Sequence, residues 1–240
     1  MTTVVKAPAV PVKATHCLFD MDGLLLNTED KYTEVSQLIL ERFGQKYEMS
    51  LKLKLMGRRE DEAAEIFVRE TGVSLTPNEY LAERRRLHIE VFPTCTPLPG
   101  VVRLVTHLRQ LAIPMAVATS SHRDMYVLKA QFNGALFDLF QGNVTTGDDA
   151  KISRGKPAPD IFLVAQEELG IPVASSVSAI VFEDAESGVR AGLAAGMHVV
   201  WVRDARLPVT DEARELEKQC FAVLGSLVDF EPAWIGLPAY

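Results

Sequence analysis

Short, unbroken apolar runs recur along the chain. The clear ones are His16–Asp20, Ile113–Thr119, Ala179–Glu183 and His198–Val202, and weaker candidates lie near Leu139–Val144 and at Phe221–Leu224. Most of these runs do not alternate with polar residues, which is typical of strands that are buried on both faces. We therefore expect strands of a buried, parallel sheet.

Apolar residues at helical spacing lie between these runs. One series follows Pro99-Gly100 and comprises Val101, Leu104, Val105, Leu108 and Leu111. A second series spans residues 161–169, where Pro159 suits the first turn and Gly170 suits the end. The small residues of Ser187–Ala195 suit a helix packed closely on a sheet. Because strand and helix alternate, the sequence predicts an α/β fold with helices on both faces of the sheet.

One region breaks this alternation. From about Lys31 to Thr96 the chain shows helical patterns and no convincing strand. We expect an all-helical insertion at residues 31–96, placed after the first strand. The α/β core would then comprise residues 15–30 and 97–240, and residues 1–14 would form a flexible leader.

Composition and charge narrow the class of protein. The chain has 240 residues and a net charge of -7, without a block of Lys or Arg, which argues against nucleic acid or an anionic membrane as the main partner. No apolar run approaches the ~18 residues of a membrane span. The three cysteines are far apart and odd in number, so we read them as reduced thiols of a cytoplasmic protein. We expect a monomer.

Polar residues stand where several of the expected strands end. Asp20 and Asp22 follow the first run, Thr119-Ser120-Ser121 the second, and Glu183-Asp184 the third, and a nearby loop carries Lys156 in Gly155-Lys156-Pro157. The carboxyl ends of parallel strands lie along one edge of the sheet, where open α/β folds bind their ligands. These side chains are therefore expected to meet.

The charge of this cluster points to a metal. Four carboxylates with one lysine need a counterion, and hard oxygen ligands without His or Cys favour Mg²⁺ over zinc. A carboxylate can also attack phosphorus to give an aspartyl-phosphate. Mg²⁺, Lys156 and Thr119 would neutralise and hold the transferring group, so the cluster predicts phosphoryl transfer.

Four motifs carry a family resemblance. The stretches "FDMDG", "ATSS", "GKPAPD" and "FEDAESGVRAG", in this order, resemble the four motifs of the haloacid-dehalogenase-like superfamily, over about His16 to Val202. The helical insertion resembles the smaller cap type of that superfamily. The resemblance implies a Rossmann-like core, a helical cap, a Mg²⁺ cofactor and a hydrolase that acts on a small phosphorylated metabolite.

The resemblance also implies roles for the matching residues. Asp20 resembles the nucleophile, and Asp22 resembles the general acid/base that also lends its main-chain carbonyl to Mg²⁺. Asp184 resembles a metal ligand, with Glu183 in or beside the ligand set. Thr119 and Lys156 resemble the phosphate-binding pair. Further substrate contacts are expected from Ser120, Ser121, His122, Arg58, Arg59 and Glu29.

Simpler interpretations stay open beside these. Asp20 and Asp22 could cap a turn, Glu183-Asp184 could cap a helix, and Lys151 competes with Lys156. Surface positions would explain His122 and one of the two arginines, Arg58 and Arg59.

Individual residues also favour one branch of the superfamily over the others. Haloacid dehalogenases lack the second aspartate, so Asp22 argues against that branch. Sugar phosphomutases carry a Lys-Gly-x-Ser-Arg stretch where this chain has Met56-Gly57-Arg58-Arg59-Glu60, and a histidine where it has Tyr32. A phosphatase is therefore expected, with a mutase of the beta-phosphoglucomutase type as the alternative and a non-catalytic sugar-phosphate sensor behind it. Stretches such as "MGRREDEAA" and "IPMAVATSS" are most similar to the pseudouridine-5'-phosphatase and glycerol- and deoxysugar-phosphate phosphatase group.

Overall fold

The computed structural model describes residues 4–55 and 60–240, and the chain divides into two compact units. The core unit comprises Met1–Leu26 and Thr96–Tyr240, and the cap unit comprises Asn27–Cys95. The predicted insertion at 31–96 thus begins a few residues too late, because the first cap helix already starts at Thr28.

The described part of the core unit forms a seven-stranded sheet with the order β1-β7-β6-β5-β2-β3-β4. Six strands, β2 to β7, run parallel, and β1 joins β7 in the antiparallel sense. The strands are β1 Val4–Lys6, β2 His16–Phe19, β3 Met115–Thr119, β4 Val144–Thr146, β5 Ala179–Glu183, β6 His198–Val202 and β7 Ala222–Leu224. This confirms the predicted parallel sheet.

One predicted strand is misplaced. The run near Leu139–Val144 is not a strand, because Asp138–Phe140 form the 3-10 helix η2 and β4 begins only at Val144. The apolar character of this segment comes from burial instead, since the Phe140 ring packs edge-on against Phe19 at 5.6 Å between centroids.

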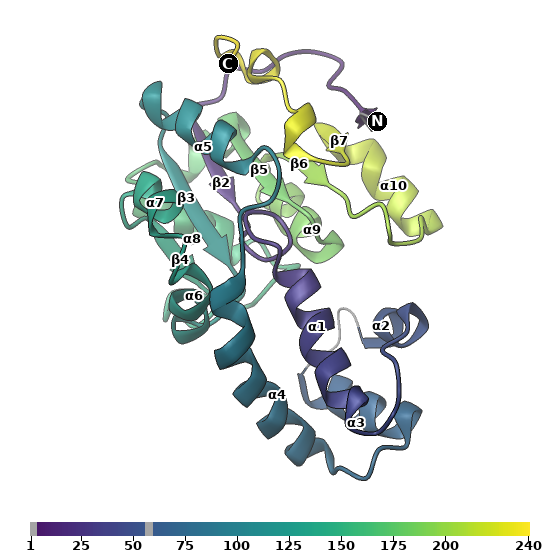
Figure 1. Cartoon of the computed structure of the whole chain (residues 1–240). Coiled ribbons are helices and arrows are strands. Elements are labelled where there is room, and N and C mark those ends of the chain that lie inside the picture. The colour runs from purple at the N-terminus through teal and green to yellow at the C-terminus, as the bar shows by residue number, and fades with distance from the viewer. Residues whose placement is uncertain (1–3, 56–59) are drawn as a thin grey trace. The chain divides into compact units, whose positions relative to one another are not determined.

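Helices cover both faces of the sheet (Figure 1). On one face α8 (Asp160–Glu168), α9 (Glu186–Ala194) and α10 (Asp211–Gln219) pack into a cluster with strand residues such as Leu18 and Val181. On the other face lies α5 (Val101–Gln110). Aromatic rings also pack against one another on that face. There Phe19 stacks on Phe182 at 4.6 Å. Burial on both faces explains the unbroken apolar runs.

Shorter helices complete the core unit. They are α6 Arg123–Ala130, α7 Gly134–Phe137, η3 Val173–Ser178, η4 Leu227–Asp229 and η5 Pro232–Ile235. None of the helices in the described part of the chain is long and apolar enough to cross a membrane.

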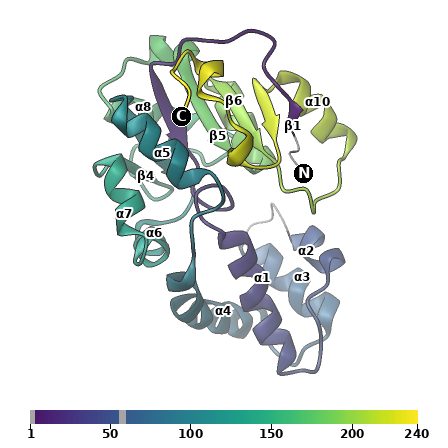
Figure 2. The same ribbon diagram turned by 45° about the horizontal axis from the view of Figure 1, so that its top comes forward.

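The leader differs from the expected flexible segment at residues 1–14. Val4–Lys6 form the edge strand β1 beside β7 (Figure 2). The Lys6 Nζ donates to three backbone carbonyls at the C-terminal end of α10, over 2.6–3.2 Å. Further along, the Val12 amide donates to the Trp234 carbonyl at 2.9 Å. The leader and the C-terminal tail are therefore joined to the core unit and to each other.

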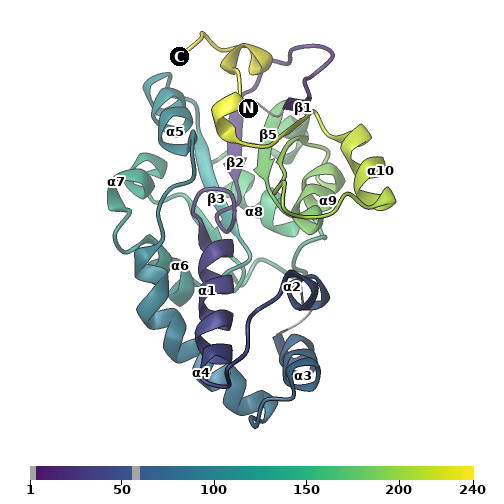
Figure 3. The same cartoon turned by 45° about the vertical axis from the view of Figure 1, so that its right-hand side comes forward.

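The cap unit is helical, as predicted (Figure 3). Its described helices are α1 Thr28–Glu41, α2 Met49–Leu55, α3 Glu60–Thr71 and α4 Pro77–Val91, and the 3-10 helix η1 Phe92–Thr94 follows them. Thr76 and Glu79 form a capping box that starts α4, with Pro77 in its first turn. Apolar side chains from all four α-helices form a separate cluster, so the cap unit has a core of its own.

Candidate active site

Three neighbouring strands of the core unit bring the predicted residues together. Asp20 directly follows β2, the central strand of the three, while Thr119 ends β3 and Glu183 ends β5. Asp20, Thr119 and Glu183 are all buried. The expected edge of the sheet is therefore the place where the polar groups gather.

Lys156 lies between two of the carboxylates. Its Nζ forms an ion pair with Asp20 Oδ1 and donates to Glu183 Oε1 at 2.6 Å and to the Ala118 carbonyl at 3.1 Å. The Lys156 side chain is only 6% exposed. Lys151, the competing lysine, is instead exposed and pairs with a surface glutamate. Of these two lysines, the structure thus brings Lys156 to Asp20.

The surroundings of Asp20 and Lys156 shift the pKa of both groups. Burial raises the pKa of Asp20 from its ordinary 3.8 to about 7, the Lys156 ammonium opposes this rise, and the Glu183 and Asp22 carboxylates add to it. Burial alone would lower the pKa of Lys156, but the Asp20 and Glu183 carboxylates raise it above its ordinary range. Lys156 therefore stays charged, while burial, together with the neighbouring carboxylates, favours a proton on Asp20 in the metal-free protein.

The carboxylates fit a divalent cation. Asp20, Glu183 and Asp184 each offer an oxygen, and the three oxygens lie within 4.8 Å of one another. Three hard oxygen donors without sulfur or imidazole suit Mg²⁺. The donor set thus matches the predicted cofactor.

Glu183 is held rigidly within this set. Its Oε2 accepts the amide hydrogens of Asp184 at 3.0 Å and of Ala185 at 3.1 Å, and its Oε1 accepts from Lys156. In α9, Gly188 leaves room for this carboxylate, since an added Cβ would lie 1.7 Å from Glu183 Oε1. The glutamate therefore orients the turn that carries Asp184 as well as contributing charge.

Asp22 has a different set of partners. Its Oδ2 accepts from the Ser121 hydroxyl at 2.8 Å and from the Thr119 hydroxyl at 3.3 Å. Its Oδ1 accepts from the Lys129 ammonium at 2.6 Å, and this lysine also donates to Ser121 Oγ at 2.8 Å. Asp20 and Asp22 thus each have a lysine of their own.

Sequence reasoning missed Lys129. It lies on α6 and is fully buried. No local pattern in the sequence singles it out, because its burial depends on Asp22 and Ser121, which come from other segments of the chain.

The remaining predicted substrate-binding residues do not form one cluster among the described residues. Ser120 and His122 are exposed beside the site, and His122 precedes α6 without capping it through its side chain. Glu29 belongs to the cap unit and forms an ion pair with Lys52 at 3.3 Å. Arg58 and Arg59 lie outside the described residues.

The cap unit contains a cavity of about 270 Å³ that is lined by both polar and apolar surface. Its lining includes the charged and phenolic side chains of Glu29, Tyr32, Lys52, Tyr80 and Arg84. Lys52 is nearly buried and also donates to the Thr33 hydroxyl at 3.1 Å. The cap cavity therefore offers hydrogen-bonding groups beside apolar surface.

Comparison with known proteins shows the family of this chain. The family model described as "Haloacid dehalogenase-like hydrolase" matches residues 17–202. The chain therefore belongs to the haloacid dehalogenase-like hydrolases. The span of the match includes the whole carboxylate and lysine cluster.

Curated relatives extend over nearly the full chain. The chain is 46% identical over 228 residues to (DL)-glycerol-3-phosphatase 2 of Arabidopsis thaliana, covering 94% of this chain and 92% of the relative. It is 42% identical over 229 residues to a Drosophila melanogaster protein named "Probable pseudouridine-5'-phosphatase", covering 95% and 96%. Among solved structures, a HAD family hydrolase from Deinococcus radiodurans R1 with bound phosphate and sodium superimposes with a TM-score of 0.75 at 25% identity, covering 92% and 95%.

Proposed function

We propose that this chain is a Mg²⁺-dependent phosphatase that hydrolyses a small phosphomonoester through an aspartyl-phosphate on Asp20. One observation carries the proposal: Asp20 pairs with a buried lysine while a second carboxylate, Asp22, stands two residues away among its own hydrogen-bond donors. A nucleophile and a separate proton carrier are what a two-step hydrolysis requires.

The first step transfers the phosphoryl group. An Asp20 carboxylate oxygen attacks phosphorus, and the bond from phosphorus to the ester oxygen breaks. Asp22 gives its proton to the departing oxygen, so the alcohol leaves neutral. The Lys156 ammonium, already beside Asp20, offsets the charge that collects on the phosphoryl oxygens.

The second step regenerates the enzyme. Asp22, now a carboxylate, takes a proton from water while that water attacks phosphorus, and the acyl-phosphate bond to Asp20 breaks. Inorganic phosphate leaves and Asp22 is again protonated. The Ser121 and Thr119 hydroxyls that contact Asp22 hold its carboxylate through both proton transfers.

The metal would be held by Asp20, Glu183 and Asp184, together with the main-chain carbonyl of Asp22. When bound, Mg²⁺ neutralises the negative charge shared by the carboxylates and the phosphoryl oxygens.

A mutase of the beta-phosphoglucomutase type has less support. The described residues include Tyr32 and Glu60, where the mutase pattern has a histidine and an arginine. A sensor without activity has less support still, since Asp20, Asp22, Thr119 and Lys156 are all present and all gathered at one edge.

The substrate we propose is a polyol phosphate or a nucleoside monophosphate. The curated relatives are named for glycerol 3-phosphate and pseudouridine 5'-phosphate. We propose that Glu29, Arg58 and Arg59 take part in choosing it. Arg58→Ala or Arg59→Ala should then shift the preference among natural esters more than the activity on a small artificial ester. A cytoplasmic location and a monomeric state remain predictions.

The deciding experiment is phosphate release from a panel of phosphomonoesters, with and without Mg²⁺, beside the Asp20→Asn variant. The panel holds glycerol phosphate, pseudouridine and uridine 5'-phosphates, 2-deoxyglucose 6-phosphate and β-glucose 1-phosphate. Mg²⁺-dependent release that Asp20→Asn abolishes supports the phosphatase. Formation of glucose 6-phosphate without phosphate release would favour the mutase instead.

A further inference from the structure

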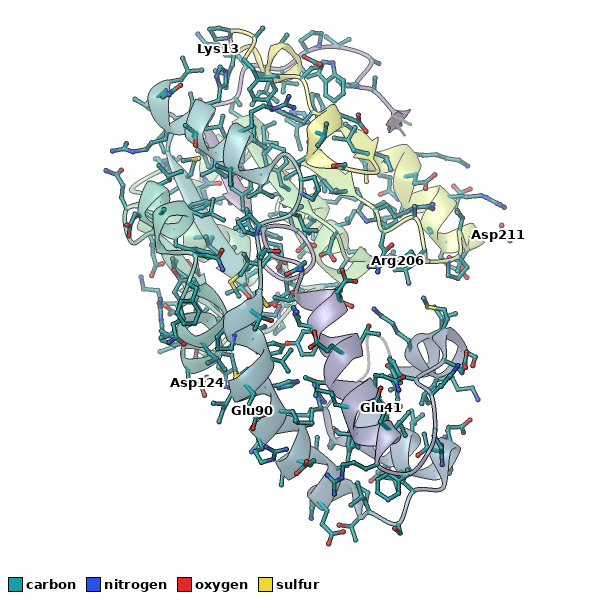
Figure 4. The ribbon with its side chains drawn as sticks, viewed as in Figure 1. Lys13, Glu41, Glu90, Asp124, Arg206 and Asp211 are labelled. Carbon is teal, nitrogen blue, oxygen red and sulfur yellow. The ribbon has the colours of Figure 1, made fainter. Side chains whose placement is uncertain are left out.

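A second buried lysine stands in the core unit beside the site. Lys129 is fully buried on α6, whereas Asp124 on the same helix is exposed and lies at the molecular surface (Figure 4). Burying an ammonium group is costly unless close partners compensate for the lost water. Lys129 is the one charged residue of α6 that is buried, and its ammonium group contacts Asp22.

The contacts of Lys129 form a closed triangle. Its Nζ lies 2.6 Å from Asp22 Oδ1 and 2.8 Å from Ser121 Oγ, and Ser121 Oγ donates in turn to Asp22 Oδ2 at 2.8 Å. Both oxygens of Asp22 are therefore held, one by the ammonium and one by the hydroxyl. Two such bonds on one carboxylate fix both its position and its rotation.

Exposure shows from which side the carboxylate is held. The Lys129 side chain is 0% exposed and the Asp22 side chain is 22% exposed. The lysine thus approaches from the interior of the core unit, and part of Asp22 remains open to a reactant. A group held from behind in this way can still transfer a proton at its open side.

We propose that Lys129, acting with Ser121, is a positioning residue that orients the Asp22 carboxylate for both of its proton transfers. This inference rests on the proposed function, because it assigns Asp22 the general acid/base role. Lys156 pairs with the nucleophile, Asp20, and Lys129 pairs with the proton carrier, Asp22, so each buried lysine holds one of the two aspartates. Proton transfer needs the carboxylate within hydrogen-bond reach of first the ester oxygen and then water.

The leaving group provides the test. A p-nitrophenolate departs without a proton, so the first step on p-nitrophenyl phosphate does not need Asp22, whereas an alkyl ester such as glycerol phosphate does. The second step needs Asp22 for either ester. Misplacing Asp22 should therefore slow both steps for the alkyl ester and only the second step for the aryl ester.

The experiment compares wild type, Lys129→Met and the surface control Lys151→Met in rapid mixing with Mg²⁺ and each ester. For Lys129→Met we expect kcat on glycerol phosphate to fall about 100-fold, with KM changed less than about threefold. On p-nitrophenyl phosphate we expect a burst approaching one p-nitrophenol per enzyme, then slow turnover. Acid quenching should trap more aspartyl-phosphate than in wild type. Lys151→Met should match wild type.

Other results overturn the inference. They are an unchanged kcat on glycerol phosphate, or equal losses on both esters without added phosphoenzyme, which a merely structural role would give. If Lys129→Met does not fold, the Ser121→Ala variant is measured instead, because it removes one side of the triangle without leaving a buried charge unpaired. A burst of p-nitrophenol from Ser121→Ala supports the inference, and the absence of a burst overturns it. Wild type without phosphate release on either ester would reject the proposed function itself, and an active wild type confines any failure to Lys129.

Discussion

Gly188 and Glu183 stand so close that no larger residue fits between α9 and the carboxylate. An added Cβ at Gly188 would lie 1.7 Å from Glu183 Oε1 and 2.0 Å from its Cδ. The Glu183 carboxylate cannot easily retreat, because Lys156 and two backbone amides hold it. Gly188 therefore helps to set the position of the Glu183 carboxylate from the side of α9.

Gly188→Ala should weaken the metal site while leaving the fold largely intact. The methyl group must displace Glu183 and with it the turn to Asp184, and losing such a support typically costs 10- to 100-fold in metal affinity or activity. The Mg²⁺ concentration for half-maximal phosphate release should rise by that factor. Gly134→Ala is the matched control, since its Cβ would meet nothing within 4 Å. Equal Mg²⁺ dependence in both variants would contradict the assigned role of Gly188.

Asp20→Asn should abolish turnover without unfolding the protein. The amide keeps the shape of the side chain but cannot form an aspartyl-phosphate, so phosphate release should fall at least 1,000-fold on every ester. The thermal midpoint, measured beside the rate, separates lost chemistry from lost structure. Substantial Mg²⁺-dependent activity in a folded Asp20→Asn variant would remove Asp20 as nucleophile.

Sequence patterns located most of the site because its residues stand at strand ends. Asp20, Thr119 and Glu183 each follow or end a buried run, and parallel strands bring such ends to one edge whatever the details of packing. Local sequence is enough for residues of this kind. The same reasoning located β5 and β6 within their observed bounds.

The sequence analysis did not predict the burial of Lys129 or the strand β1, because both depend on contacts with distant parts of the chain. A lysine on a helix usually faces water, and only the approach of Asp22 and Ser121 from other segments makes burial of Lys129 favourable. Strand β1 has three residues and depends on β7, more than two hundred positions away, for its pairing. Neither feature has a local pattern strong enough to read without the fold.

Lys6→Met should destabilise the core unit. Lys6 Nζ donates to three carbonyls at the C-terminal end of α10, where a cation also meets the negative end of the helix dipole. We expect the free energy of unfolding in urea to fall by about 1–2 kcal/mol. Lys13→Met, at an exposed position labelled in Figure 4, should change it by less than about 0.5 kcal/mol. Equal effects of the two changes would show that β1 is not anchored by this lysine.

Stabilisation by Mg²⁺ should grow with pH. Burial raises the pKa of Asp20 to about 7, so in the metal-free protein folding favours its protonated form. That contribution to stability is complete below the unfolded pKa of 3.8 and is lost as the pH rises through about 7. Mg²⁺ must displace this proton at low pH but not at high pH.

The increase in thermal midpoint caused by a fixed Mg²⁺ concentration should therefore be small at pH 5.5 and several degrees larger at pH 8. Taking the difference with and without metal at each pH cancels groups remote from the site, such as the buried His16, whose pKa burial lowers. Asp20→Asn has no proton to displace, so its smaller increment should lose most of its pH dependence. A wild-type increment that stays constant from pH 5.5 to 8 would mean that Asp20 is already ionised before the metal binds.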